Sequence, residues 1–292
     1  MSRIELVEVA PRDGLQNEPR VLPTADKIEL VRRAIDAGAR RLEVASFVHP
    51  DKVPQMADAE AVVAGLPRGD ARYIGLVLNK RGALRALETD VDEIGLVCAA
   101  SDTFGVRNQG MNVEQSLAMT LDVIRLCRTQ GRAVQTTIAV AFGCPFEGAA
   151  DPRRVVDMAR RIADAGPVEV AIADTIGIAR PIEVERLSAA VAAAIAPLPL
   201  RVHFHDTRGM GVANVLAAIR AGAVTVDAAI GGTGGCPFAP GAAGHVASED
   251  VAYALGEALD LDIAKLVATA GWLNQRLGRD RTSAVARAFS AS

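Results

Sequence analysis

Three of the four histidines in this chain lie within residues 200–245. His203 and His205 are two positions apart in Leu-Arg-Val-His-Phe-His-Asp, so on a strand both side chains point to the same face. His245 closes a glycine-rich segment that also carries Cys236. Two imidazoles side by side on an inward face indicate a metal site rather than two buried histidines that are satisfied by hydrogen bonds.

A carboxylate and a guanidinium follow the first predicted strand, in Ala-Pro-Arg-Asp-Gly. Asp13 could supply an anionic ligand beside the imidazoles, although taken alone it is more typical of a turn. Arg12 could stabilise negative charge that develops on an oxygen, or form a structural salt bridge. Glu43 lies inside an apolar strand, where a buried carboxylate needs a partner, and Arg12 on the adjacent strand is the candidate. We therefore expect Glu43 to orient Arg12.

One carboxylate combined with two or three nitrogen or amide donors suits Mg²⁺, Mn²⁺ or Co²⁺ better than structural zinc, which favours thiolates. A divalent ion bound in this way can chelate an alkoxide and an adjacent carbonyl oxygen. It would then stabilise charge while a carbon–carbon bond is broken or formed.

Asp174 and Cys236 are further candidates. Asp174 precedes Thr175 and could be a base, a substrate contact or a neighbour of a metal ligand. Cys236 follows the glycines of 231–235, so a flexible lid could bring its thiol to a substrate. Those glycines could instead cradle a phosphate, and the cysteine could be a small buried residue.

Strand-like and helix-like segments alternate along the chain without a linker. Apolar β-type runs are expected at 4–9, 42–47, 73–78, 93–99, 134–141, 168–173, 200–204 and 225–230. Helix-length segments are expected at 24–37, 53–64, 112–129, 152–165, 181–194 and 211–221, the first with Thr24 as its N-cap and Gly38 just beyond its end.

Eight such units predict an α/β fold, a (β/α)8 TIM barrel over about residues 3–258, within a single domain. Residues 259–292 then add one or two C-terminal helices. A doubly wound sheet is the alternative, but the first turn lacks the glycine pattern of a dinucleotide site.

The predicted barrel explains where the chemically capable side chains fall, because barrel active sites lie at the carboxyl ends of the strands. Those ends carry Arg12, Asp13, Glu43, Ser101, Asp174, Thr175, His203 and His205, followed by Cys236 and His245. Ordinary turn residues would be expected there in a purely structural barrel. The coincidence over several strands therefore favours an enzyme more strongly than any single motif.

Composition narrows the function further. The net charge is −3 and aromatic residues are only 3%, which disfavours nucleic-acid binding. The four cysteines are isolated and form no CxxC pair. Such cysteine usage is typical of a protein in a reducing compartment. No targeting segment and no apolar run long enough for a bilayer is recognisable. We expect a soluble cytoplasmic protein without a nucleic-acid or membrane partner.

Six motifs resemble the hydroxymethylglutaryl-CoA lyase family within the DRE-TIM metallolyases, and they run in family order over nearly the whole chain. They are Val-Glu-Val-Ala-Pro-Arg-Asp-Gly-Leu-Gln-Asn-Glu (7–18), Glu-Val-Ala-Ser-Phe-Val (43–48) with Val-Pro-Gln-Met-Ala-Asp (53–58), Ala-Ser-Asp-Thr-Phe (100–104), Ala-Asp-Thr-Ile-Gly (173–177), His-Phe-His-Asp-Thr-Arg-Gly (203–209) and Gly-Gly-Cys-Pro-Phe-Ala-Pro-Gly-Ala (234–242).

The resemblance implies metal-dependent cleavage of 3-hydroxy-3-methylglutaryl-CoA to acetyl-CoA and acetoacetate, a reaction of leucine degradation and ketone-body formation. Mg²⁺ or Mn²⁺ is the implied cofactor, with no nucleotide beyond the CoA of the substrate, and a homodimer is expected by analogy. The implied roles are metal binding for Asp13, His203 and His205, enolate stabilisation for Arg12 with support from Glu43, protonation by Cys236, and positions around the substrate for Asp174, Thr175 and Ser101.

This sequence departs from the family pattern at three places. His245 stands where the family has an asparagine that supplies a metal oxygen, and Pro19 replaces a lysine. The segment 108–112, which shapes the substrate pocket, also differs. His245 can still ligate, so a changed metal preference or a lyase for another 3-hydroxyacyl-CoA is possible. A barrel that binds metal or CoA esters without turnover is the alternative of a different class.

Overall fold

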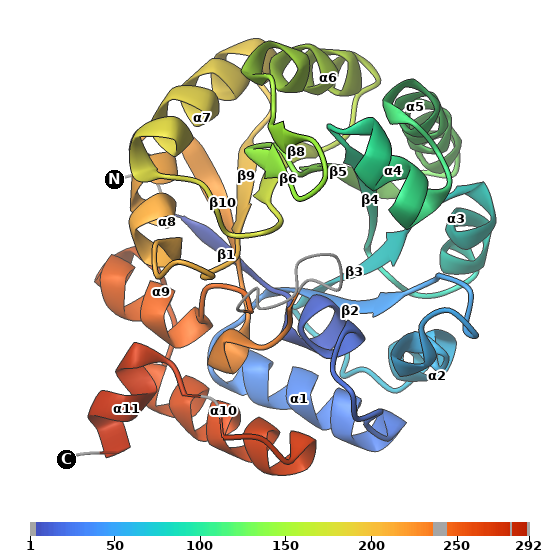
Figure 1. Cartoon of the computed structure of the whole chain (residues 1–292). Helices are drawn as coiled ribbons and strands as arrows, with labels where there is room; N and C mark the ends of the chain where they lie inside the picture. The colour runs from blue at the N-terminus through green and yellow to red at the C-terminus, as the bar shows by residue number, and fades with distance from the viewer. Residues whose placement is uncertain (1–3, 236–243, 281, 291–292) are drawn as a thin grey trace.

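Eight parallel strands close into a barrel in the part of the chain that the computed structural model describes, residues 4–235, 244–280 and 282–290 (Figure 1). Around the barrel the strands follow the order β1-β10-β9-β8-β5-β4-β3-β2. They are β1 (Glu5–Glu8), β2 (Arg41–Ser46), β3 (Arg72–Val77), β4 (Glu93–Ala99), β5 (Ala133–Ala139), β8 (Glu169–Asp174), β9 (Leu200–Phe204) and β10 (Ala223–Ala228). The predicted (β/α)8 fold is confirmed.

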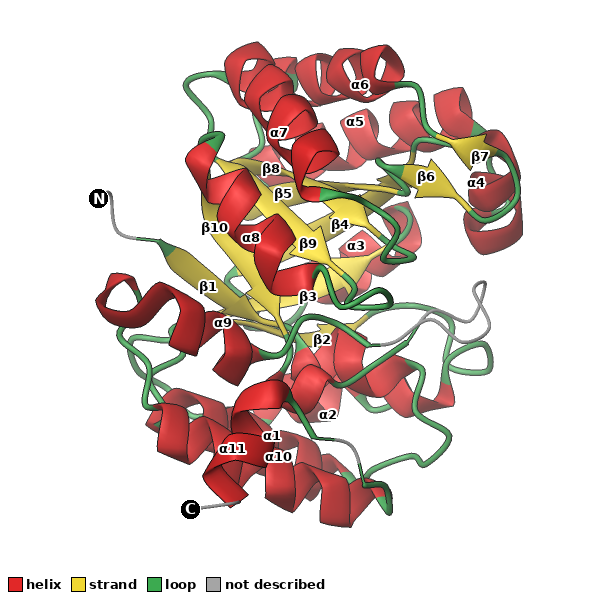
Figure 2. Cartoon of the chain, turned by 60° about the vertical axis from the view of Figure 1, so that its left-hand side comes forward, coloured by secondary structure: helices red, strands yellow, loops and turns green. Residues whose placement is uncertain are grey.

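Helices surround this barrel on its outside (Figure 1). They are α1 (Thr24–Asp36), α2 (Ala59–Ala64), α3 (Lys80–Leu87), α4 (Asp102–Gln109), α5 (Val113–Thr129), α6 (Pro152–Asp164), α7 (Pro181–Ile195), α8 (Gly211–Arg220), α9 (Ser248–Leu255), α10 (Ile263–Leu277) and α11 (Ala284–Ser290). Short helical turns cover Ala10–Gly14 (η1), Pro54–Met56 (η2), Ile230–Gly232 (η3) and Gly256–Ala258 (η4), and β6 (Gly143–Cys144) pairs with β7 (Gly148–Ala149) in a small hairpin that lies next to α4 (Figure 2).

Local sequence explains where several helices begin. The Asn112 side chain accepts a hydrogen bond from the Gln115 backbone N–H and the Gln115 side chain accepts one from the Asn112 N–H, which makes a capping box at the start of α5. The Asp151 side chain caps α6 by accepting a hydrogen bond from the Arg153 backbone N–H, ahead of Pro152. Ser101 caps α4, so this helix starts directly beyond the end of β4.

Two predictions about the first helices are wrong. Thr24 is not the N-cap of α1, because Pro23 occupies that position and the Thr24 hydroxyl donates to Asp58 Oδ2 at 2.6 Å. The expected helix at 53–64 is broken into η2 and α2. The buried Lys27 ammonium explains the break. It donates hydrogen bonds to the Gln55 carbonyl, at 2.5 Å, and to the Asp58 carboxylate, at 2.5 Å, so the Gln55 carbonyl within η2 is bonded to a side chain.

The segment after β10 adds helices α9, α10 and α11, and α10 packs against α1 (Figure 1). The predicted C-terminal helices at 259–292 are therefore present. Among the described residues, no helix combines the length and apolar character that crossing a bilayer requires.

Candidate active site

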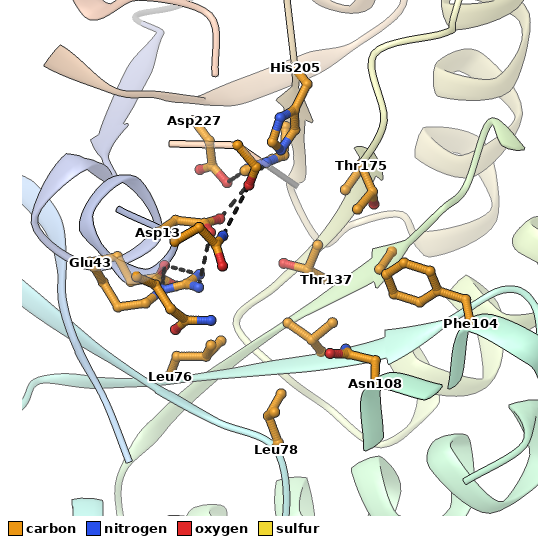
Figure 3. Close-up of a pocket in the computed structure, with 18 of the residues that line it drawn as sticks. Asp13, Glu43, Leu76, Leu78, Phe104, Asn108, Thr137, Thr175, His205 and Asp227 are labelled. Carbon is orange, nitrogen blue, oxygen red and sulfur yellow. Dashed lines mark hydrogen bonds and ion pairs between the residues drawn. The ribbon is translucent and has the colours of Figure 1, made fainter. Parts of the chain in front are cut away.

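Charged side chains from the carboxyl ends of several barrel strands meet in one cavity of about 150 Å³ (Figure 3). Its charged and imidazole lining consists of Arg12, Asp13, Glu43, Arg201, His203, His205 and Asp227. These residues come from η1, β2, β9, the residue after β9 and β10. The barrel thus brings together side chains that lie as far apart in the sequence as Arg12 and Asp227.

The η1 turn directs Arg12 and Asp13 toward this cavity. It is a single π-helical turn directly after β1, in which the Gly14 N–H donates to the Val9 carbonyl at 3.1 Å. Isolated π-turns occur frequently at functional sites. A Cβ atom on Gly14 would lie 3.1 Å from the Thr233 side chain, so glycine lets this turn approach the segment that follows η3.

Three buried imidazoles form a cluster beside that turn. His203 lies on β9 and His205 follows it, and their ring centroids are 5.4 Å apart. His245 pairs with His205 in an antiparallel bridge, and its ring centroid lies 4.9 Å from that of His203 and 4.4 Å from that of His205. One nitrogen from each ring lies within 4.8 Å of the others, a spacing compatible with one shared metal ion.

The tautomers of two rings show that this cluster fits a cation. The Thr233 carbonyl can only accept, so His245 Nδ1, 2.5 Å away, carries the proton in a neutral ring. His203 Nδ1 likewise faces a carboxylate oxygen of Asp227 at 3.0 Å. The Nε2 lone pairs of both rings then face Asp13 Oδ2, at 3.3 Å from His245 and 3.9 Å from His203.

Acceptors that face one another in a buried site are unfavourable unless positive charge lies among them. Among the described residues, His245 Nε2 makes no hydrogen bond although it is buried. Asp13, His203, His205 and His245 therefore form a donor set that fits a divalent cation.

Asp227 sets the electrostatics of His203. Burial favours the neutral acid, but the Arg201 guanidinium and the His203 donor outweigh it and hold the pKa of Asp227 below its usual range. The same hydrogen bond raises the pKa of His203 against the effect of burial. A carboxylate behind a ligating imidazole fixes the ring orientation and makes the imidazole more basic.

Arg12 lies between two carboxylates. Its guanidinium forms a buried ion pair with Glu43, as the sequence predicts, and its Nη1 lies 3.2 Å from Asp13 Oδ1. Burial opposes ionisation of Asp13, but Arg12 and the nearby imidazoles hold the pKa of Asp13 well below its usual range. Asp13 is consequently an anion, as a ligand of a divalent cation must be.

Comparison with known proteins identifies the family of this chain. The HMGL-like family model matches residues 3–271. The chain belongs to this family of carbon–carbon lyases.

Its relatives act on related substrates. A 3-hydroxy-3-isohexenylglutaryl-CoA/hydroxymethylglutaryl-CoA lyase from Pseudomonas aeruginosa is 40% identical and covers 99% of this chain and 98% of its own. An (R)-citramalyl-CoA lyase from Chloroflexus aurantiacus is 39% identical, with 99% and 95% covered. An HMG-CoA lyase from Acinetobacter baumannii, in complex with coenzyme A and 3-methylmalate, has a TM-score of 0.92 at 40% identity, with 98% and 94% covered.

Not every predicted site residue of this HMGL-like chain lines the cavity. Thr175 does, and its Oγ1 accepts from the Val140 N–H at 2.8 Å. The Asp174 carboxylate accepts hydrogen bonds from the backbone N–H groups of Ile178 and Ala179, at 3.0 and 2.9 Å. It therefore holds the loop after β8. Burial raises the pKa of Asp174.

Ser101 does not line the cavity either. Its hydroxyl donates to Cys144 Sγ at 2.9 Å and accepts from the Phe104 N–H at 3.3 Å. Cys236, the predicted proton donor, lies outside the described residues. The catalytic and substrate-binding roles of Asp174, Ser101 and Cys236 stay predictions.

Sequence reasoning missed Asp227 and Thr233, which orient His203 and His245. Asp227 had a readable signal, because it is a carboxylate within an apolar strand, as Glu43 is. Sequence reasoning also missed the apolar side chains on the other side of the cavity from His205, which are Leu76, Leu78 and Phe104 (Figure 3). Val97 is a further apolar residue of the lining. Asn108 adds an amide to this lining and belongs to the segment that departs from the family pattern.

Proposed function

We propose that this chain cleaves 3-hydroxy-3-methylglutaryl-CoA to acetyl-CoA and acetoacetate in a divalent-metal-dependent retro-aldol reaction. The observation that supports this most is the cluster of Asp13 with three buried histidines at the carboxyl edge of the barrel. Its members Asp13, His203 and His205 line the cavity together with Arg12. The hydroxymethylglutaryl-CoA lyases among its relatives support the choice of substrate.

The reaction breaks one carbon–carbon bond and conserves protons. The C3 hydroxyl loses its proton and C3 becomes the ketone carbon of acetoacetate. The electrons of the C2–C3 bond pass to C2, which gives the enolate of acetyl-CoA, and C2 then takes up a proton. A divalent cation held by Asp13, His203, His205 and His245 would supply positive charge next to the reacting oxygens.

Arg12 is suited to stabilise the enolate oxygen. Its ion pair with Glu43 is buried and fixes the guanidinium before substrate binds, so little reorganisation is needed during the reaction. Glu43 is then a positioning residue that acts through Arg12. By the family resemblance, Cys236 donates the proton to C2, and Thr175 lies close enough to the cavity to contact the acyl group.

The apolar part of the cavity lining supports a substrate with a small branch at C3. The cavity lining includes Leu76, Leu78, Val97 and Phe104, and these apolar side chains can pack against a methyl group. Asn108 can donate a hydrogen bond to an oxygen of the acyl group.

(R)-Citramalyl-CoA is the second candidate substrate, because a lyase of that name is 39% identical over nearly the whole chain. Cleavage of the same type of bond would give acetyl-CoA and pyruvate instead of acetoacetate. The product that accompanies acetyl-CoA therefore distinguishes the two substrates.

The test uses protein stripped of metal and then supplied with Mg²⁺ or Mn²⁺ separately. We expect metal-dependent release of acetyl-CoA and acetoacetate from 3-hydroxy-3-methylglutaryl-CoA, at a higher kcat/KM than pyruvate release from citramalyl-CoA. The opposite ranking would assign citramalyl-CoA. If a folded protein that binds metal cleaves neither thioester, the proposed substrates are refuted, and other 3-hydroxyacyl-CoA thioesters or a binding role remain. The dimer, the cytoplasmic location and the pathway stay predictions.

A further inference from the structure

The proposed metal site contains more nitrogen than oxygen. Three imidazoles, from His203, His205 and His245, accompany the single carboxylate of Asp13. Mg²⁺ prefers oxygen ligands and keeps several waters, whereas imidazole suits Zn²⁺, Co²⁺ and other later divalent metals. We propose, on the basis of the metal site in the proposed function, that this centre selects a transition metal over Mg²⁺ and that His245 determines the selection.

The backbone around His245 holds it at the cluster. The Asp206 N–H donates to the Gly244 carbonyl at 2.9 Å, and the Val246 N–H donates to the Phe204 carbonyl at 3.0 Å. These bonds extend β9 by a short antiparallel pairing, which seats the imidazole beside His205. The third nitrogen donor thus lies on the same rigid barrel edge as the other two.

The His245 ring packs closely against Gly234 and Thr233. Gly234 has a φ of +106°, and a Cβ atom there would lie 2.6 Å from His245 Cε1. A side chain at position 234 would therefore collide with the ring. His245 Nδ1 is fixed by the Thr233 carbonyl, and the Thr233 hydroxyl accepts a hydrogen bond from Arg279 at 2.8 Å.

The hydrogen bonds to the rings of His203 and His245 leave the Nε2 atom of each ring available to bind a metal. The Thr233 carbonyl accepts a hydrogen bond from His245 Nδ1, and the Asp227 carboxylate accepts one from His203 Nδ1. Such partners fix the tautomer and increase the basicity of the ligating nitrogen. A more basic imidazole gains more with a later divalent metal than with Mg²⁺.

The test measures binding of metal alone to stripped protein, without substrate. Calorimetric titrations with Mg²⁺, Mn²⁺, Co²⁺ and Zn²⁺ should give the weakest binding for Mg²⁺. The ratio of the Mg²⁺ dissociation constant to the Co²⁺ dissociation constant should be on the order of 100. His245→Asn replaces the nitrogen donor by an amide oxygen and should reduce this ratio at least about 10-fold, mainly by weakening Co²⁺. His49→Asn is the matched control, because His49 is exposed and lies outside the cluster, and it should leave the ratio unchanged.

A second readout needs no variant. The Co²⁺-loaded wild-type chain should show three paramagnetically shifted imidazole N–H signals in its NMR spectrum, one for each ligating histidine. Two signals, or equal affinities for Mg²⁺ and Co²⁺, would overturn the inference, as would an unchanged ratio in a folded His245→Asn variant. A chain that selects Co²⁺ but cleaves no thioester would refute only the proposed function. A chain that cleaves the thioester without metal selectivity would refute only this inference.

Discussion

Glu8 is a buried carboxyl group that holds the active-site end of β1 to two other segments. Its Oε1 accepts hydrogen bonds from the backbone N–H groups of Ala10 and Ile230, at 2.9 and 3.0 Å, and its Oε2 accepts one from the Ser248 hydroxyl at 2.6 Å. Burial outweighs these bonds and raises the pKa of Glu8 to about 7, with a further contribution from the nearby Glu249. The folded chain therefore retains a proton at Glu8 that the unfolded chain releases near its ordinary pKa of 4.5.

The sign of the effect on stability follows from this proton. Between pH 4.5 and 7 the folded state binds more protons at this site than the unfolded state does, so the free energy of unfolding decreases as the pH rises. Above pH 7 the full loss applies, on the order of 3 kcal/mol for this pKa difference. Glu8→Gln removes the charge and keeps an acceptor oxygen for the two N–H groups. We expect the free energy of unfolding of the variant to exceed that of wild type by about 1–3 kcal/mol at pH 8. The gain is smaller than the full loss because the second N–H of the buried amide needs a partner of its own.

Urea unfolding of both proteins at pH 5, 6, 7 and 8 measures this difference. The advantage of Glu8→Gln should be small or absent at pH 5 and should grow through pH 7. Glu185→Gln, on the exposed face of α7, is the control and should show no such growth. If Glu8→Gln gives the same difference from wild type at every pH, Glu8 does not titrate in this range and the reasoning is refuted.

Substitutions at three further positions test the site. Asp227→Asn should weaken Mn²⁺ binding by about 10- to 100-fold in calorimetry, because the His203 imidazole loses its carboxylate partner, and unchanged affinity would contradict that role. Arg279→Ala should weaken Mn²⁺ binding while Arg279→Lys recovers part of the loss, because Arg279 holds the Thr233 segment; equal affinities in the two variants would argue against such positioning. Cys236→Ser should lower kcat by about 100-fold or more in an acetyl-CoA release assay and leave metal affinity within a few-fold, whereas full turnover would remove this thiol from the mechanism.

The strands were predictable because a barrel buries them on both faces, so each is an apolar run between turn residues. Strands β4 and β9 have the predicted bounds. Helix α4 was not predicted, because it buries little besides Phe104 and Gly105 and so has no apolar stripe at helical spacing. The break between η2 and α2 depends on the buried Lys27, a contact between distant segments that local propensity does not contain.

Parts of the site could be predicted for a different reason. The spacing of His203 and His205 places both imidazoles on one face whatever the surroundings, and the ring separation of 5.4 Å agrees with this. The contact of Arg12 with Glu43 follows from neighbouring strands and from the need to pair a buried carboxylate. The orientation of the Asp174 carboxylate toward the N–H groups of its own loop depends on loop conformation, which the sequence pattern does not determine.

Buried charges connect the end of the barrel that carries the histidine cluster to its opposite end. Arg41 pairs with Glu169 at 3.1 Å, and Arg201 lies 3.6 Å from Glu169 and 3.5 Å from Asp227, which in turn orients His203. Removing one member of such a buried network leaves an uncompensated charge and costs about 3–5 kcal/mol. Any rearrangement of His203 would therefore disturb ion pairs within the barrel. These ion pairs hold the His203 imidazole in one orientation, which preorganises the histidine cluster.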